Sequence, residues 1–268
     1  MKFTLQKIGR PLVPSVSPRG TPVCAVPPPQ NATDSFRIPR WKRVLDLTAV
    51  ILLLPVVLPL ALGIAVLIRL VSRGPILFKQ ERMGYRCKTF MCLKFRTMVV
   101  GADTTNHQGH LDHLMASNAP MVKLDARGDS RIIPLGLLLR SAGLDELPQL
   151  INVLRGEMSL VGPRPCLAYE FDKYLPWQRE RFNTLPGLTG LWQVSGKNRT
   201  TFTEMMQLDI DYVRRKTLWL DVLIILKTLP AVVVQMWDLK VSKPRRGVSG
   251  ADHRAPALQK AAVLPPAV

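Results

Sequence analysis

The hydrophobic pattern is strongest between Leu47 and Ile68, where 22 consecutive residues carry no charge and almost all are aliphatic. That length meets the requirement of about 20 apolar residues for a membrane helix. Basic residues flank the run on both sides, Arg37, Arg40, Lys42 and Arg43 before it and Arg69, Arg73, Lys79, Arg82 and Arg86 after it. Because Lys and Arg favour the cytoplasmic side, a helix that enters, bends and returns keeps both clusters inside.

Two prolines, Pro55 and Pro59, lie near the middle of this run. Each removes a backbone donor and can kink a helix. We therefore expect a re-entrant, broken membrane helix over residues 40–73, whose freed carbonyls must find partners. A plain membrane span is the alternative, and a buried helix of a soluble core fits poorly with so long an uncharged run.

A second apolar segment, Leu218–Val234, is interrupted by Asp221, Lys227 and Pro230. It fits an interfacial helix lying on the bilayer better than a span. The mixed patterns predict two further helices, Tyr169–Phe182 and Phe202–Arg215. Strands are expected after the Gly74-Pro75 turn and over Thr89–Met98, where cations alternate with apolar residues.

Residues 101–129 form a polar insertion with three histidines spaced by three, His107, His110 and His113. On a helix their directions spread over about 120°, which is a poor metal-binding face. We expect a mobile loop here, with zinc or iron binding as the alternative.

An acidic pair, Asp145 and Glu146, precedes apolar residues at i, i+3, i+4 and i+7, namely Leu147, Leu150, Ile151 and Leu154. This period predicts a short helix with one buried face, opened by the pair and stopped at Gly156. The positive end of a helix favours anions and metal-bound phosphates. The alternative is that Asp145 caps the helix and Glu146 complements its dipole.

Cations gather around the acidic pair in the sequence. Arg140 lies five residues before Asp145, and Arg164 follows in the sequence Gly162-Pro163-Arg164-Pro165. Carboxylates that can hold a divalent cation, beside arginines that can hold phosphate, indicate phosphate chemistry. Lys94 and Arg96 would share one strand face and could add to that site, or form a solvated face instead.

The segment Pro186–Gly196 is a glycine-punctuated loop. Such a loop lets the backbone approach a ligand closely, and a plain turn before a strand is the alternative. Its candidate ligand contacts are Pro186, Gly187, Thr189, Gly190 and Gln193.

The formal net charge of +18 over 268 residues implies an anionic partner. Nucleic acid is disfavoured, because the basic residues are not interleaved with aromatic side chains and aromatic content is 6%. Residues 1–39 are expected to be a disordered basic Pro-rich arm, and residues 239–268 a flexible basic tail rich in Pro and Ala.

Six motifs occur in one order along the chain: Lys42-Arg43-Val44-Leu45-Asp46, Lys94-Phe95-Arg96-Thr97-Met98, Leu144-Asp145-Glu146-Leu147-Pro148-Gln149-Leu150, Gly162-Pro163-Arg164-Pro165, Pro186-Gly187-Leu188-Thr189-Gly190 and Leu218-Trp219-Leu220-Asp221. Together they resemble the bacterial sugar transferase family, the monotopic polyprenyl-phosphate hexose-1-phosphate transferases of the exopolysaccharide-initiating type. The resemblance covers about residues 40–238. It departs at Leu58, where the family often has Ser before the proline matched by Pro59, and at Gly143, where members often have Ser.

The resemblance implies a mixed α/β, helix-dominated fold. Residues 74–238 would form a compact cytosolic catalytic domain with interfacial amphipathic helices, anchored by the re-entrant helix with its break at Pro59 and Pro55. Asp145 would be the nucleophile and Glu146 its partner, both near Mg²⁺, with phosphate held by Arg140 and Arg164. The substrates would be a UDP-hexose and undecaprenyl phosphate, and UMP would be released. The family resemblance also implies that the candidate ligand contacts of the Pro186–Gly196 loop lie on the nucleotide side of the substrate.

The implied location is the bacterial inner membrane, with the catalytic domain facing the cytoplasm among inner-membrane lipids. Downstream glycosyltransferases would take the product, and a homodimer is possible. Two other classes stay open. One is a membrane phosphatase that uses the same aspartyl chemistry with water as acceptor. The other is a non-enzymatic basic scaffold attached to the membrane, in which the acidic pair only caps a helix.

Overall fold

The structure, a computed structural model, describes residues 38–102, 105–117, 119–121, 131–196 and 199–241, and for 105–108 and 232–241 it describes the backbone alone. The arm predicted over residues 1–39 and the tail predicted over 239–268 lie largely outside these ranges.

Helices dominate the described chain. The α-helices are α1 (Arg40–Val71), α2 (Thr105–Ser117), α3 (Gly136–Ser141), α4 (Gln149–Arg155), α5 (Ala168–Asp172), α6 (Leu191–Val194), α7 (Phe202–Arg215) and α8 (Leu218–Val241). Three 3-10 segments are η1 (Tyr85–Cys87), η3 (Leu144–Glu146) and η4 (Pro176–Asn183). The strands are β1 (Leu77–Met83), β2 (Thr89–Phe95), β3 (Ser159–Val161) and β4 (Gly187–Thr189). The expected mixed, helix-dominated class is confirmed.

The strands form two small sheets. β1 and β2 make an antiparallel hairpin whose register runs from Leu77 opposite Phe95 to Met83 opposite Thr89. β3 and β4 pair in parallel, which is possible because a long stretch with helices separates them in the sequence. Both strands expected before position 100 are confirmed.

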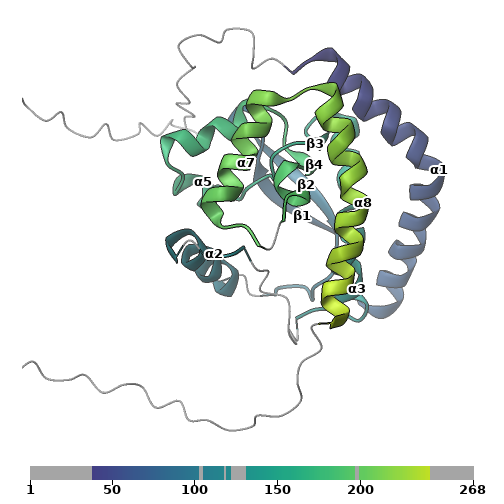
Figure 1. Cartoon of the computed structure of the whole chain (residues 1–268). Helices are drawn as coiled ribbons and strands as arrows, with labels where there is room; N and C mark the ends of the chain where they lie inside the picture. Colours follow the sequence, from purple (N-terminus) through teal and green to yellow (C-terminus); the bar gives the residue numbers. More distant parts are fainter. Residues whose placement is uncertain (1–37, 103–104, 118, 122–130, 197–198, 242–268) are drawn as a thin grey trace, which may run out of the picture.

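Figure 1 shows α1 and α8 along one side of the molecule, the strands in its middle, and α2, α5 and α7 on the other side. One core cluster, which includes Ile64, Phe95 and Leu139, joins the second half of α1 to β2 and α3. Another, which includes Val50 and Val153, joins the first half of α1 to β2, α4, β3, α7 and α8. Both halves of the first helix therefore pack on the same body.

The helix α1 continues through Pro55 and Pro59 without interruption, and Figure 1 shows it following a bent course. The predicted break therefore takes the form of a bend in a continuous helix. Its middle is exposed, with Leu52 at 74% and Val56 at 68%. Among the described residues, α1 is the one helix long and apolar enough to cross a membrane, judged by length and composition.

The polar insertion contains more structure than we expected. Residues Thr105–Ser117 form α2, and Leu111 and Leu114 on it are buried against the core beneath α5 and α7. The loop prediction is wrong for this helix, because two leucines three residues apart give it an apolar face. Within the described ranges, no three His, Cys, Asp or Glu residues are grouped to hold a metal ion.

Two helix predictions near the C-terminal half fared differently. The segment expected as one helix over Tyr169–Phe182 is the short α5 followed by the 3-10 segment η4. The helix expected over Phe202–Arg215 has those bounds, because Thr201 and Glu204 form a capping box at its start.

Candidate active site

The acidic pair lies in η3, a single 3-10 turn between α3 and α4. Gly143 enters the turn in the left-handed region, with φ 69°, and Pro148 is the N-cap of α4. The prediction that the pair opens the helix is therefore wrong, since α4 begins after it. Asp145 is 9% exposed, whereas Glu146 is only half-buried.

The predicted buried face of α4 is also wrong in part. Leu150 is buried, but Ile151 and Leu154 are each 40% exposed. The face that packs inward instead carries Asn152 and Val153, both fully buried, because α4 lies against β2 and β3 on that side. Two large apolar side chains of α4 are thus left on the surface.

Strand β2 brings Lys94 to the acidic pair. The Lys94 ammonium lies 2.7 Å from the Glu146 Oε1, and the two side chains are 23% and 36% exposed. This ion pair joins β2 to η3. It also sets a cation beside the Glu146 carboxylate of the acidic pair, where a phosphate group would need one.

Arg96 lies elsewhere. Its guanidinium donates to the carbonyls of Ser72 (3.0 Å) and Arg73 (2.8 Å), just past the last turn of α1. A cation there satisfies orphan carbonyls and complements the helix dipole. The structure thus gives Arg96 a role at the end of α1, and its phosphate contact stays a prediction.

Two buried guanidinium groups fix the backbone around Arg164. Arg82 donates to the Pro165 carbonyl (2.7 Å), and Arg181 donates to the Arg164 carbonyl (2.7 Å). Arg181 also forms a buried ion pair of 2.5 Å with Asp209. Burial raises the pKa of Asp209 to about 6, although the charge of Arg181 opposes that shift. Sequence reasoning missed both supports, because Arg82 is one of the basic residues that follow the apolar run and Arg181 lies in a segment predicted only as a helix.

The Arg164 guanidinium has no side-chain hydrogen bond or ion pair to any residue that the structure describes. Its charge lowers the pKa of Arg82, after burial, which is the larger cause. Burial raises the pKa of Cys92 on β2, and the charges of Lys94, Arg82 and Arg164 oppose that rise while Glu146 adds to it. Arg164, Lys94 and Glu146 therefore all lie close enough to Cys92 of β2 for their charges to act on its thiol.

The first and last motifs meet in a buried network. The Lys42 ammonium lies 2.6 Å from Asp221 Oδ2, and it donates to the Val161 carbonyl and the Tyr212 hydroxyl, both at 2.8 Å. The Tyr212 hydroxyl donates to Asp221 Oδ1 at 2.8 Å. Burial and the Asp221 charge raise the pKa of Tyr212. Residues 162–165, which contain Arg164, are called the Arg164 loop. Since Val161 directly precedes Gly162, the network fixes the start of this loop to α1, α7 and α8.

Asp46, the last residue of the first motif, holds strand β3, which ends at Val161. Its Oδ1 accepts hydrogen bonds from the Ser159 hydroxyl and the Leu160 amide, both at 2.9 Å. Arg43, in the same motif, donates to the carbonyls of Val153 and Leu154 at the end of α4. The start of α1 is thus attached to both elements that flank the site.

The glycines of the predicted nucleotide loop pack against protein backbone. A Cβ on Gly187 or on Gly190 would overlap backbone atoms of Gly162, and one on Gly162 would overlap the strand that holds Gly187. The Pro186 carbonyl accepts from the Ser159 amide at 2.9 Å. The close approach that these glycines allow is therefore between β4 and the Arg164 loop, whereas a nucleotide contact stays a prediction.

The polar side chains of that loop are used within the protein. The Thr189 hydroxyl lies 2.8 Å from the Thr228 hydroxyl on α8, and the Gln193 amide donates to the Leu188 carbonyl at 3.1 Å. The Thr189 contact holds the loop against α8, and the Gln193 bond lies within the loop, so contact of these side chains with a nucleotide stays a prediction.

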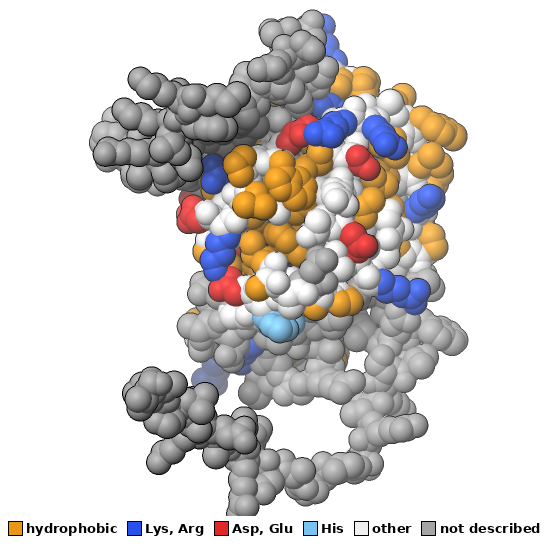
Figure 2. Space-filling model, turned by 60° about the vertical axis from the view of Figure 1, so that its left-hand side comes forward, with side chains coloured by type: hydrophobic (Ala, Val, Ile, Leu, Met, Phe, Trp, Pro, Cys, Tyr) orange, Lys and Arg blue, Asp and Glu red, His pale blue; other side chains and the backbone are white. Residues whose placement is uncertain are grey.

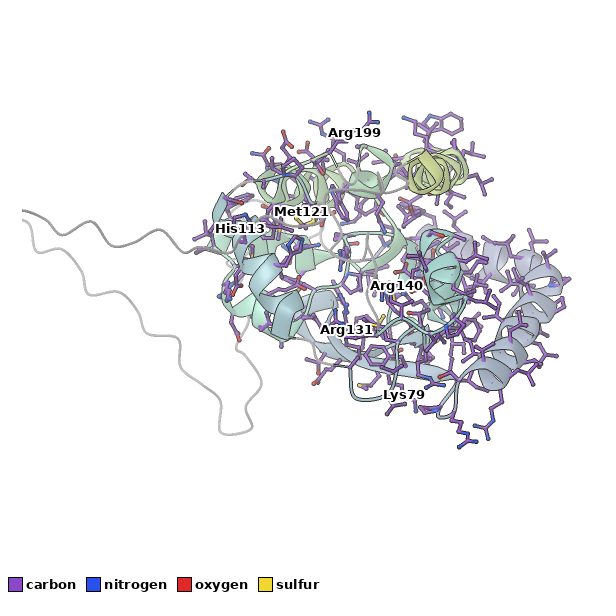
Figure 3. The ribbon with its side chains drawn as sticks, turned by 90° about the horizontal axis from the view of Figure 1, so that it is seen from below. Lys79, His113, Met121, Arg131, Arg140 and Arg199 are labelled. Carbon is purple, nitrogen blue, oxygen red and sulfur yellow. The ribbon has the colours of Figure 1, made fainter. Side chains whose placement is uncertain are left out.

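Arg140 lies in the last turn of α3 and is half-buried. Figure 3 shows Arg140 and Arg131 toward the middle of the molecule, whereas Lys79 lies at its lower edge in that view. Because η3 follows α3 after two residues, Arg140 stays close in the chain to Asp145.

The acidic pair offers two adjacent carboxylates and no further acidic or histidine ligand among the described groups. Mg²⁺ is usually held by one or two carboxylates together with substrate phosphates and waters. The residues present therefore fit a Mg²⁺ ion that arrives with a diphosphate. They do not fit a zinc or calcium cage built from protein alone.

Known proteins are similar to this chain over the region that contains these residues. The sequence pattern of the bacterial sugar transferase family matches residues 38–235. The exopolysaccharide production protein ExoY of Sinorhizobium fredii is 36% identical over 214 residues, which cover 76% of this chain and 95% of that protein. A UDP-glucose:undecaprenyl-phosphate glucose-1-phosphate transferase of Caulobacter vibrioides is 42% identical over 200 residues, 72% of this chain and 69% of that protein.

A longer relative, the undecaprenyl-phosphate galactose phosphotransferase of Salmonella typhimurium, is 38% identical over 198 residues, 72% of this chain but 40% of that protein. The matched region begins just before α1 and ends within α8, so it contains the acidic pair, the Arg164 loop and the buried Lys42 network. The chain belongs to the bacterial sugar transferase family.

Proposed function

We propose that this chain transfers hexose 1-phosphate from a UDP-hexose to undecaprenyl phosphate, releases UMP and so begins the synthesis of an exopolysaccharide or related glycan. The observation that carries the proposal is the partly exposed Lys94–Glu146 ion pair, next in the chain to the nearly buried Asp145, with the Arg164 charge also close enough to act on Cys92 of β2. The names of the Caulobacter and Salmonella relatives support both the lipid acceptor and the hexose phosphate.

The first step is an attack by Asp145 on the sugar-linked phosphorus of the UDP-hexose. A bond forms between a carboxylate oxygen and phosphorus, the bond between the two phosphates breaks, and UMP leaves with the electron pair. Such a covalent intermediate divides one difficult transfer into two easier ones. Burial of Asp145 keeps water away from its carboxylate. A carboxylate with fewer bound waters is a stronger nucleophile toward phosphorus.

In the second step, an oxygen of undecaprenyl phosphate attacks the same phosphorus. The acyl phosphate bond breaks, Asp145 regains its carboxylate, and undecaprenyl-diphospho-hexose leaves. Lys94, Arg164 and Arg140 supply the positive charge that these phosphate oxygens need in both steps. Bound Mg²⁺, held by Asp145 and Glu146, would screen the charge of the diphosphate as UMP departs.

The attachment of α1 supports a re-entrant anchor. Near its start, Lys42 is bonded to Val161 and Asp221, and past its end Arg96 is bonded to Ser72 and Arg73. Both ends are thus held on the same body, while the middle of the helix is exposed and apolar. A bilayer leaflet that covers that middle would leave both basic flanks on the cytoplasmic side.

Other elements on this side add apolar surface. The exposed side chains include Leu138 on α3 (55%), Ile151 on α4 (40%), and Leu226 and Leu229 on α8 (60% and 73%). The face turned forward in Figure 2, on the α2 and α5 side, instead mixes acidic and basic side chains with its apolar patch. This contrast supports a lipid-facing side built from α1, α3, α4 and α8, with α8 interfacial.

The cellular setting follows from the two substrates, one a lipid and the other soluble. We place the chain on the bacterial inner membrane, monotopic, with its site facing the cytoplasm and its product passing to downstream glycosyltransferases. Relatives named for glucose and for galactose are both similar, so the proposal keeps the two sugars. A homodimer stays a prediction.

The test is UMP release from UDP-glucose and UDP-galactose by the detergent-solubilised protein, with and without undecaprenyl phosphate. We expect turnover only with the lipid, and a preference that names the sugar. Release of inorganic phosphate without the lipid would favour a phosphatase. A folded, lipid-bound protein that releases no UMP would leave the scaffold as the better account.

A further inference from the structure

Asn152 is a fully buried residue of α4 whose carboxamide contacts the edge of β2. Its Oδ1 accepts from the Leu93 amide at 3.1 Å, and its Nδ2 donates to the Met91 carbonyl at 2.8 Å and to the Glu157 carboxylate at 2.6 Å. A rotated amide would set its oxygen against two acceptors, so this set of partners fixes the orientation.

The carboxamide takes the place of a neighbouring strand. Within the hairpin, Met91 and Leu93 of β2 stand opposite Glu81 and Lys79 of β1. The Leu93 amide and the Met91 carbonyl point away from β1, and both form hydrogen bonds with the Asn152 carboxamide. A residue of a parallel strand facing Cys92 would form the same two hydrogen bonds. Without this partner, the buried edge of β2 would hold an unsatisfied amide and carbonyl.

Asn152 joins the two elements that carry the ion pair of the site. Lys94 follows Leu93 on β2, and Glu146 precedes α4 with only Leu147 and Pro148 between them. The 2.7 Å contact of Lys94 with Glu146 bridges β2 and η3, next to the bridge that Asn152 makes between β2 and α4. A shift of β2 along α4 would therefore move the ammonium relative to both carboxylates.

We infer that Asn152 is a positioning residue that holds Lys94 against Glu146 during hexose-1-phosphate transfer. The inference rests on the proposed function for the reaction itself. Asn152 does not touch substrate, because its carboxamide is fully engaged by Leu93, Met91 and Glu157. Asn152 affects the reaction only by holding the Lys94 side chain in position.

One arm of the test does not depend on activity. Hydrogen exchange of the peptide spanning 89–96 is compared in the full-length wild type, in Asn152→Leu and in Leu114→Ala, all in detergent. Leu114 is buried on α2, outside the site, so its truncation is a matched control for a loss of core packing. We expect faster exchange of β2 in Asn152→Leu and an unchanged rate there in Leu114→Ala.

The second arm is a double-mutant cycle on UMP release. Lys94→Met is measured alone, with Asn152→Leu and with Leu114→Ala. If Asn152 positions Lys94, the Lys94→Met loss should shrink from about 100-fold to about threefold or less with Asn152→Leu, because Lys94 is already misplaced there. It should stay near 100-fold with Leu114→Ala, whose effect on stability is independent.

The outcomes separate the two proposals. An equal Lys94→Met loss in all three backgrounds, or no loss in any, overturns the positioning role while wild-type UMP release leaves the proposed function standing. Unchanged β2 exchange in Asn152→Leu overturns the positioning role as well. If the wild type releases no UMP and β2 exchanges faster in Asn152→Leu, the proposed function is overturned. The hydrogen bonds by which Asn152 holds β2, and with it Lys94, are then still supported.

Discussion

The ammonium of Lys42 and the carboxylate of Asp221 lie 2.6 Å apart, with side-chain exposures of 0% and 1%, and join the start of α1 to α8. They are separated by 179 residues of sequence. Through the Val161 carbonyl, the same ammonium fixes the strand that leads into the Arg164 loop. The buried Lys42 ammonium therefore links the helix α1 to both α8 and the Arg164 loop.

Lys42→Met should cost about 3–5 kcal/mol of unfolding free energy, because it leaves Asp221 buried without its cation. The double variant Lys42→Met, Asp221→Leu should recover most of that loss, since it removes both charges. Urea unfolding in detergent measures each value. A single variant as stable as wild type would contradict the buried pair.

Lys94→Met should lower the rate of UMP release by about 100-fold, because a cation aimed at the phosphates is lost. Its unfolding free energy should change by less than about 1 kcal/mol, since the ion pair is partly exposed. Lys79→Met is the matched control: Lys79 lies exposed on the neighbouring strand and should be replaced without loss. Equal rates for both variants would remove Lys94 from the site.

Arg96→Met separates two roles for this guanidinium. Because it bonds the Ser72 and Arg73 carbonyls, we expect a loss of about 1–3 kcal/mol of unfolding free energy and an unchanged KM for the UDP-hexose. Steady-state kinetics beside thermal unfolding gives both quantities. A tenfold rise in KM at unchanged stability would instead support the phosphate contact predicted from the sequence.

Gly187→Ala should cost about 3 kcal/mol or more, because the added methyl overlaps the Gly162 backbone. Gly109→Ala is the control, since nothing lies within 4 Å of its Cβ position on α2 and alanine favours a helix by about 0.5–1 kcal/mol. Thermal unfolding compares them. If Gly187→Ala keeps its stability and only loses UDP-hexose binding, the glycine serves the nucleotide.

Removal of divalent cations should stop UMP release, and added Mg²⁺ should restore it, because two carboxylates and a diphosphate together make a suitable site. Glu146→Gln should raise the Mg²⁺ concentration that gives half-maximal rate. Activity that persists in excess EDTA would exclude Mg²⁺ from the proposed mechanism.

The sequence singled out Asp145, Glu146 and Arg164 as candidates because their motifs are local, and it predicted α7 with its bounds from the pattern of the segment itself. It could not pair Lys42 with Asp221, since no local pattern records which distant charge a buried ammonium meets. Asp221 looked like an interruption of an apolar helix, although it is fully buried. An isolated carboxylate in an apolar segment was the available signal.

The face of α4 was misjudged for a different physical reason. Periodicity shows which positions are apolar, and it assumes that apolar positions face the core. On α4 the inward face carries Asn152, which completes the edge of β2, while Ile151 and Leu154 remain on the surface. A helix between a protein core and a candidate lipid surface breaks the assumption.

The most direct test of the central claim is the mass of the intact protein after incubation with UDP-hexose and Mg²⁺ in the absence of undecaprenyl phosphate. The account predicts an adduct of one hexose phosphate, mapped to Asp145, absent in Asp145→Asn and discharged when undecaprenyl phosphate is added. An active wild type that never carries the adduct, or an Asp145→Asn variant that carries it, would contradict the account.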